Sequence, residues 1–117
     1  MIFEVIQNPL QSGPSGFSQN QFRKLDQLYC RAASTGILHD RTVECDFDAG
    51  LASYTYYRSD VGAPYLQFLI RRTGPRATMY ELYKRGKGRI AKSGIFDRTY
   101  ERLVQEVEFL VNKDSSF

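Results

Sequence analysis

The sequence predicts an α+β fold, a two-layer sandwich in which two helices cover one face of an antiparallel meander sheet. Three observations lead to this prediction. Apolar residues recur at helical spacing in two segments, the apolar period falls towards two between them, and short turns separate the successive extended segments. Consecutive strands with short turns pair antiparallel, and the two apolar helix stripes are available to cover one face. The expected element order is β-α-β-β-β-β-β-α.

The first 35 residues predict a short strand, a loop and a helix. Residues 2–6 alternate around one acidic residue and predict a short strand, which could pair at either edge of the sheet. Residues 8–16 are rich in Pro, Gly and Ser and form a loop by composition. Ser18 and Gln21 then stand at capping-box spacing, and one apolar stripe follows them. We therefore predict a helix over residues 19–35.

In the middle of the chain, the spacing of apolar residues changes to the alternation typical of strands. In residues 42–48, acidic side chains alternate with Val, Cys and Phe, which predicts a half-buried strand. The segments that follow are rich in β-forming residues and are bounded by turns or loops that contain Gly or Pro. The expected strands are residues 42–48, 51–58, 65–72, 77–84 and 89–95.

A second amphipathic helix is predicted for residues 98–112, with Asp97 as its N-cap. Residues 113–117 are expected to be a frayed C-terminal tail. If both helices cover one face of the sheet, the other face carries the polar alternates and many of the tyrosines.

Composition bounds the class of protein. A length of 117 residues suits a single domain over residues 1–117. With 42% hydrophobic and 25% charged residues, the chain is too apolar to be disordered. No apolar run approaches the roughly 18 residues that cross a bilayer, and the first residues lack the basic region of a signal peptide. Cys30 and Cys45 match no metal or redox spacing, so we expect reduced, packed thiols in a cytoplasmic protein with no membrane partner.

Basic residues are concentrated in one part of the chain. Residues 71–102 hold ten basic and three acidic residues, whereas residues 1–70 hold five basic and seven acidic ones. A strand over residues 77–84 spans about 25 Å, so the turns at its two ends divide these charges into two clusters. One cluster comprises Arg71, Arg72 and Arg76, and the other comprises Lys84, Arg85, Lys87 and Arg89.

Each cluster has a binding interpretation and a structural one. The first cluster, with Arg98 at the start of the second helix, could converge on one anion. Alternatively, its arginines pair across strands with Glu44, Asp46 and Asp48. The Gly-flanked turn around Lys87 could approach a phosphate, although it matches no nucleotide-binding loop, or it is a basic hairpin that deters edge pairing.

Tyrosines suggest a second surface. Tyr54 and Tyr56 share one face of a predicted strand, and Tyr80 lies in a neighbouring segment. If Tyr80 shares that face, the sheet presents an aromatic surface. Such a surface can stack nucleobases or line a ligand cavity, but more often it belongs to the core or to a dimer interface.

No arrangement of residues predicts catalysis. His39 is the only histidine, and no nucleophile motif, metal-ligand set or cofactor motif is present in the sequence. We expect a non-catalytic interaction domain that self-associates, as a dimer, and whose basic hairpin turns face an acidic or anionic partner. One alternative is a nucleic-acid-binding protein that uses the basic turns. Another is a small-molecule-binding or enzymatic domain with a cavity lined by Tyr and Arg.

Overall fold

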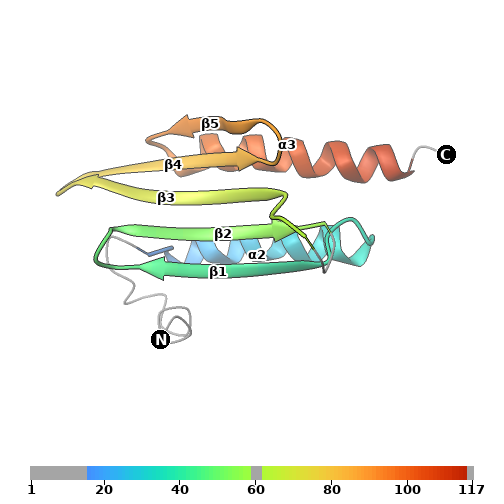
Figure 1. Cartoon of the computed structure of the whole chain (residues 1–117), viewed down its shortest axis with the longest axis horizontal. Helices are drawn as coiled ribbons and strands as arrows, with labels where there is room; N and C mark the ends of the chain where they lie inside the picture. Colours follow the sequence, from blue (N-terminus) through green and yellow to red (C-terminus); the bar gives the residue numbers. More distant parts are fainter. Residues whose placement is uncertain (1–15, 59–61, 116–117) are drawn as a thin grey trace.

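The computed structural model describes residues 16–58 and 62–115, and the strand predicted for residues 2–6 lies outside this range. The described part is a five-stranded sheet preceded by one helix and followed by another (Figure 1). The elements are helix α2 (Gln19–Ser34), strands β1 (Asp40–Asp46), β2 (Leu51–Tyr57), β3 (Leu66–Gly74), β4 (Ala77–Lys84) and β5 (Gly88–Ser93), and helix α3 (Phe96–Ser115). The predicted α+β class is confirmed.

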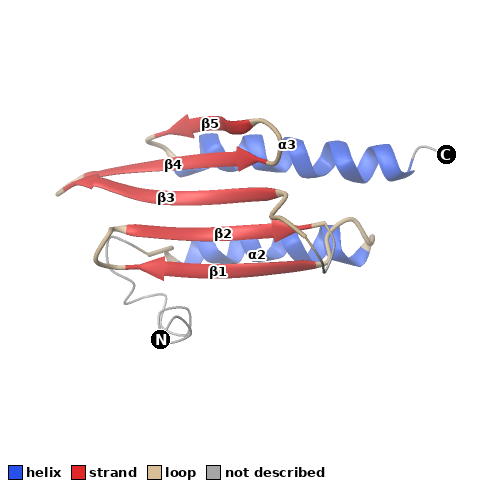
Figure 2. Ribbon diagram, viewed as in Figure 1, coloured by secondary structure: helices blue, strands red, loops and turns tan. Residues whose placement is uncertain are grey.

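The strands form an antiparallel meander in which each strand pairs with its neighbours in sequence, in the order β1-β2-β3-β4-β5. Both helices lie on one face of the sheet, with α2 behind β1 and β2 and α3 behind β4 and β5 (Figure 1, Figure 2). The helices run in the same direction, so both begin at one end of the sheet and both end at the other (Figure 2). The two-layer arrangement is therefore the predicted one.

Helix α2 begins where the sequence places it. The Ser18 hydroxyl accepts a hydrogen bond of 3.1 Å from the Gln21 amide, and the Gln21 side chain accepts one of 3.0 Å from the Ser18 amide. These two bonds form the predicted capping box and satisfy amides that have no partner inside the helix. The helix ends at Ser34, one residue before the predicted end. Its buried side chains are Leu25, Leu28 and Ala32, which all belong to the predicted stripe.

Helix α3 begins earlier than predicted. Asp97 is not the N-cap, because the helix already includes Phe96 and places Asp97 in its first turn. The Phe96 ring is buried and stacks on Tyr100 at 5.4 Å between centroids, so aromatic packing sets the helix start. The Asp97 carboxylate instead lies 3.0 Å from the Lys24 ammonium and links the two helices. Residues 113–115, expected in the tail, belong to this helix, and residues 116–117 lie outside the described range.

The core lies between the helices and the sheet. The registers Tyr54↔Phe68 and Tyr56↔Leu66 place these four residues on the covered face, where each has an exposed fraction of 0%. Tyr80, on the same face, packs partly buried against this core. Tyr54, Tyr56 and Tyr80 therefore do share a face, but the helices cover it, so the exposed aromatic surface is wrong and the alternative that these tyrosines belong to the core is confirmed.

Buried tyrosines need partners for their hydroxyl groups, and the helices supply them. The Tyr54 hydroxyl donates to Oδ1 of Asp26 at 2.6 Å, and the Tyr56 hydroxyl donates to the Leu25 carbonyl at 3.0 Å. Burial, the largest influence on both groups, raises the pKa of each phenol well above its ordinary value. Both phenols therefore stay neutral hydrogen-bond donors, and they tie the sheet to α2.

Polar and charged residues at alternate strand positions lie on the open face of the sheet, which is the face away from the helices, as predicted. The strand registers place acidic residues on the β1 edge of this face and basic residues on the β5 edge. The acidic ones are Asp40, Glu44 and Asp46, and the basic ones are Arg89 and Lys92. The open face therefore changes sign from one edge to the other.

Neither α2 nor α3 could cross a membrane, since within the described residues no helix is both long and apolar enough.

Candidate functional site

The two basic clusters lie at opposite ends of strand β4. Arg76 stands in the turn that joins β3 to β4, at the end of the sheet where both helices begin (Figure 1). Arg85 and Lys87 stand in the turn that joins β4 to β5, at the end where both helices finish (Figure 1). The ten basic residues therefore do not form one continuous surface.

Intramolecular contacts already occupy part of the first cluster. Nε of Arg71 lies 3.1 Å from a carboxylate oxygen of Glu81, whose side chain is only 3% exposed. The Arg72 guanidinium donates to the backbone carbonyls of Gly74 at 3.1 Å and of Pro75 at 2.8 Å. These two arginines stabilise the β3–β4 hairpin. Arg76 and Arg98 are exposed, and no contact between them joins the two into one anion site in the described structure.

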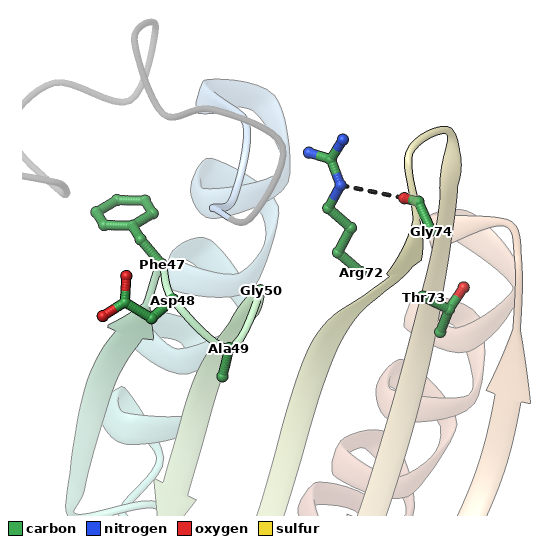
Figure 3. A pocket seen from close by; sticks show the side chains of 7 residues that line it. All are labelled: Phe47, Asp48, Ala49, Gly50, Arg72, Thr73 and Gly74. Carbon is green, nitrogen blue, oxygen red and sulfur yellow. Dashed lines mark hydrogen bonds between the residues drawn. The ribbon is translucent and has the colours of Figure 1, made fainter.

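A hollow of about 600 Å³ lies beside Arg72, where the β3–β4 hairpin extends past the shorter β1–β2 hairpin (Figure 3). Phe47, Asp48, Ala49, Gly50, Arg72, Thr73 and Gly74 line it. The Arg72 guanidinium donates to its own turn, and the Asp48 carboxylate points away from Arg72 on the opposite hairpin (Figure 3). Because the only lining cation is bound to backbone carbonyls, this hollow is a poor site for an anion.

The second cluster gains a residue that the sequence analysis did not include. Arg58 follows β2 and lies with its guanidinium carbon 5.5 Å from the centre of the Tyr65 ring. The guanidinium carbon of Arg85 lies 5.4 Å from the centre of the same ring. Both distances are within the range of cation–π attraction. Arg58, Tyr65, Arg85, Lys87 and Arg89 are called the basic end below.

Cations at the basic end differ from those near the helices. Ion pairs among the described residues join Lys24–Asp97, Arg31–Glu108, Arg41–Asp26, Arg71–Glu81, Lys84–Glu106 and Arg102–Glu106. Arg58, Arg85, Lys87 and Arg89 are exposed, and none of the described carboxylates pairs with them. Four positive charges therefore face solvent at one end of the sheet.

Lys84, the first residue of the predicted second cluster, has a structural role. Its ammonium lies 2.8 Å from Glu106 of helix α3, and Arg102 binds the other oxygen of the same carboxylate at 3.1 Å. Burial works to raise the pKa of Glu106, but the hydrogen bonds from Lys84 and Arg102 outweigh it and hold this pKa below its ordinary value. Glu106 therefore stays ionised and fixes α3 to the end of β4.

A second hollow, of about 240 Å³, opens beside Tyr65. It is lined by Pro64, Tyr65, Leu66, Gln67, Tyr83, Lys84 and Arg85. Two of the lining residues, Tyr65 and Tyr83, are aromatic, and both are half-buried. Its lining cations are Lys84, which is paired with Glu106, and Arg85, whose guanidinium donates a long hydrogen bond of 3.5 Å to the Ala63 carbonyl. Unlike the hollow beside Arg72, it has no carboxylate among its lining residues, and Arg85 and the two rings suit it to an anionic ligand that carries a planar group.

Alternation explains which tyrosines reach this hollow. Tyr83 pairs with Gln67 in the β3–β4 register, so both lie on the open face, whereas Tyr54 and Tyr56 pair with Phe68 and Leu66 on the covered one. Successive side chains of a strand point to opposite faces, so once the apolar residues of β3 identify the covered face, the sequence itself indicates which tyrosines lie on the open face.

The residues of interest for metal binding and nucleophilic chemistry are dispersed. No group of three or more His, Cys, Asp or Glu residues is placed to hold a metal ion within residues 16–58 and 62–115. Cys45 packs against the core as predicted, and burial raises the pKa of its thiol. Cys30 is exposed, so its predicted packing is wrong. Both thiols are free, as expected.

Comparison with protein-family models, with curated proteins and with solved structures gave no match to this chain.

Proposed function

We propose that this chain is a non-catalytic interaction domain that binds an anionic partner through its basic end. The observation that carries the proposal is the contrast in pairing: cations near the helices form ion pairs, two of which join a helix to the sheet, whereas Arg58, Arg85 and Lys87 form no ion pair with a described carboxylate and Arg89 acts on Glu81 only through space. Like charges held close together repel one another, and an anionic partner relieves that repulsion.

Geometry supports the same proposal. Arg85 and Lys87 of the β4–β5 turn and Arg89 at the start of β5 lie within five residues, and the Tyr65 ring lies beside both Arg85 and Arg58 of a distant segment. The Arg85 amide donates to the Tyr65 carbonyl at 2.9 Å, which fixes the turn to the start of β3. A charged surface held on rigid hairpin backbone loses little conformational entropy when it binds.

The test measures binding of fluorescein-labelled heparin by fluorescence anisotropy at low salt. The variant Arg85→Gln/Lys87→Gln/Arg89→Gln removes three charges from the basic end. A matched control, Arg23→Gln/Arg76→Gln/Arg98→Gln, removes three exposed charges from the opposite end of the sheet. We expect the first variant to weaken binding about tenfold or more and the control to change it by less than about threefold. Equal losses in the two variants, or no binding by the unmodified chain, would refute the proposal.

Self-association through the open face of the sheet is a second candidate. It is favoured by the opposite charges of Glu44 on strand β1 and Lys92 on strand β5, which lie on the same face. Two copies related by a twofold axis that runs parallel to the strands, above β3, would face each other with β1 of each copy opposite β5 of the other. The acidic edge of each copy then meets the basic edge of its partner, so the same attraction occurs twice in the interface.

A further inference from the structure

We infer that the basic end binds single-stranded nucleic acid, with one base in the hollow between Tyr65 and Tyr83 and the adjoining phosphates on Arg85, Lys87 and Arg89. This inference rests on the proposed function and names the class of its anionic partner. It concerns the hollow of about 240 Å³ whose lining includes Gln67 and Tyr83, two residues of the open face.

Four side chains surround this hollow because of the strand pairing. Gln67 is opposite Tyr83 in the β3–β4 register, and Tyr65 and Arg85 stand two residues further along on the same face. Two rings and one amide are thereby brought together beside a guanidinium. Aromatic rings offer stacking surfaces to a base, an amide offers hydrogen bonds to its edge, and a guanidinium offers contacts to phosphate.

The two rings are held in place before any ligand arrives. The Tyr83 hydroxyl donates to Oε1 of Glu81 at 2.7 Å, and Arg71 binds the other oxygen of that carboxylate at 3.1 Å. The guanidinium carbons of Arg58 and Arg85 lie over the Tyr65 ring, 5.5 Å and 5.4 Å from its centre, so Tyr65 already contacts two guanidinium groups. Tyr83, fixed through Glu81, is the ring that loses little entropy when a base stacks on it.

Gln67 keeps an acceptor for the ligand. Its amide nitrogen donates to the Thr55 hydroxyl at 3.4 Å, which leaves the amide oxygen to accept a hydrogen bond from the edge of a base. The neighbouring Lys84 ammonium is bound by Glu106, so the phosphate contacts fall to Arg85 and to Lys87 and Arg89 further along the turn.

The arrangement favours a single strand over a duplex and over an acidic peptide. Bases in a duplex are stacked on each other and cannot enter a hollow between two side chains, whereas bases of a single strand can. An acidic peptide would satisfy the cations but would make no use of two tyrosine rings and an amide. The phosphate-linked base is common to RNA and DNA, so both sources are tested.

The experiment compares labelled ligands of equal length on the full chain: oligo(U), oligo(dT), an abasic deoxyribose phosphate oligomer, a DNA duplex and poly-Glu. We expect at least one of the two single strands to bind about 5-fold to 100-fold more tightly than the abasic oligomer, the effect of base stacking on an aromatic ring. Tyr83→Leu, which removes a ring outside the basic end, should reduce that ratio and leave binding of the abasic oligomer unchanged. Tyr65→Leu should reduce the ratio as well. Tyr83→Phe, which keeps the ring, should preserve most of the ratio.

Each outcome separates the inference from the proposed function. Equal binding of the abasic oligomer and both single strands would overturn the inference and leave the basic end as an anion-binding surface. Tighter binding of the duplex or of poly-Glu than of the single strands would also overturn it. Failure of every ligand, heparin included, would overturn both. If a leucine variant does not fold, the ratio measured on the unmodified chain still decides.

Discussion

The hydroxyl of Tyr54 on strand β2 donates a hydrogen bond of 2.6 Å to Oδ1 of Asp26 on helix α2. Nε of Arg41 on strand β1 lies 2.9 Å from the same oxygen and forms an ion pair with it. The Arg41 guanidinium also packs against the rings of Tyr29 and Tyr54. One carboxylate thus ties the first helix to the first two strands.

Removing the Tyr54 hydroxyl should destabilise the fold. A hydrogen bond to a charged group contributes about 1.5–3 kcal/mol, so we expect Tyr54→Phe to lower the free energy of unfolding by that amount in urea denaturation. The control is Tyr57→Phe on the same strand, whose hydroxyl makes an exposed contact of 3.3 Å with Thr42. Its effect should stay below about 0.5 kcal/mol. Equal effects of the two variants would contradict the role assigned to Asp26.

Acid should weaken the attachment of helix α3 to the sheet. The pKa of Glu106 is below its ordinary value because its bonds to Lys84 and Arg102 outweigh the effect of burial. A carboxyl with a lowered pKa stabilises the fold above its unfolded pKa, and this contribution is lost as the pH falls through its folded pKa. The fold should therefore lose stability as the pH falls below the ordinary carboxyl value of 4.5.

The variant Glu106→Gln isolates this contribution. We expect it to lower the free energy of unfolding at pH 7 by about 1–3 kcal/mol and to change it little at acid pH, where the native carboxyl is protonated as well. Glu101→Gln is the matched control on the same helix, since Glu101 is exposed and forms no ion pair with the described residues. A pH profile of stability that Glu106→Gln leaves parallel to that of the unmodified chain would contradict the assignment.

Gly50, in the β1–β2 hairpin, should tolerate an added side chain less well than Gly36 does. Its φ is +65°, and an added Cβ would stand 3.1 Å from the Cβ of Arg72. Gly36, at the end of α2, has a φ of +82° but no atom within 4 Å of an added Cβ. Both alanine variants incur the left-handed backbone cost of about 1–2 kcal/mol, and only Gly50→Ala adds crowding. Thermal unfolding should show a larger loss for Gly50→Ala, and the reverse order would contradict the described packing.

Self-association, if it uses the open face, should respond to charge exchange. Sedimentation velocity should detect a dimer at low salt that weakens as salt is added. Glu44→Lys/Asp46→Lys makes the β1 edge basic, and Arg89→Glu/Lys92→Glu makes the β5 edge acidic. Each variant alone should be monomeric, whereas a mixture of the two should form a heterodimer. A chain that is monomeric under all conditions, or a dimer unaffected by these exchanges, would exclude this interface.

The fold could be predicted because its determinants are local. The stripe of α2, the capping box at Ser18 and the alternation in β1 each depend on residues close together in sequence. The start of α3 was not predictable in this way, because it depends on the packing of Phe96 against Phe68 and Tyr80, residues that only the folded sheet brings near.

Pairing between distant segments also explains what the sequence did not reveal about the sites. The acidic residues of β1 were plausible partners for Arg71 and Arg72, but β1 is an edge strand that pairs only with β2, and Glu81 of β4 faces Arg71 instead. Arg58 belongs to the basic end because β2 ends beside the start of β3. Its position in the acidic part of the sequence gave no indication of this.

The salt dependence of heparin binding is the most direct measurement of the central claim. If Arg85, Lys87 and Arg89 contact anionic groups, a plot of log affinity against log salt should have a slope of about −2 or steeper for the unmodified chain. Glutamine at these three positions should bring the slope close to zero, and glutamine at Arg23, Arg76 and Arg98 should leave it unchanged. A slope that the two triple variants reduce equally would show that net charge, and not the basic end, accounts for binding.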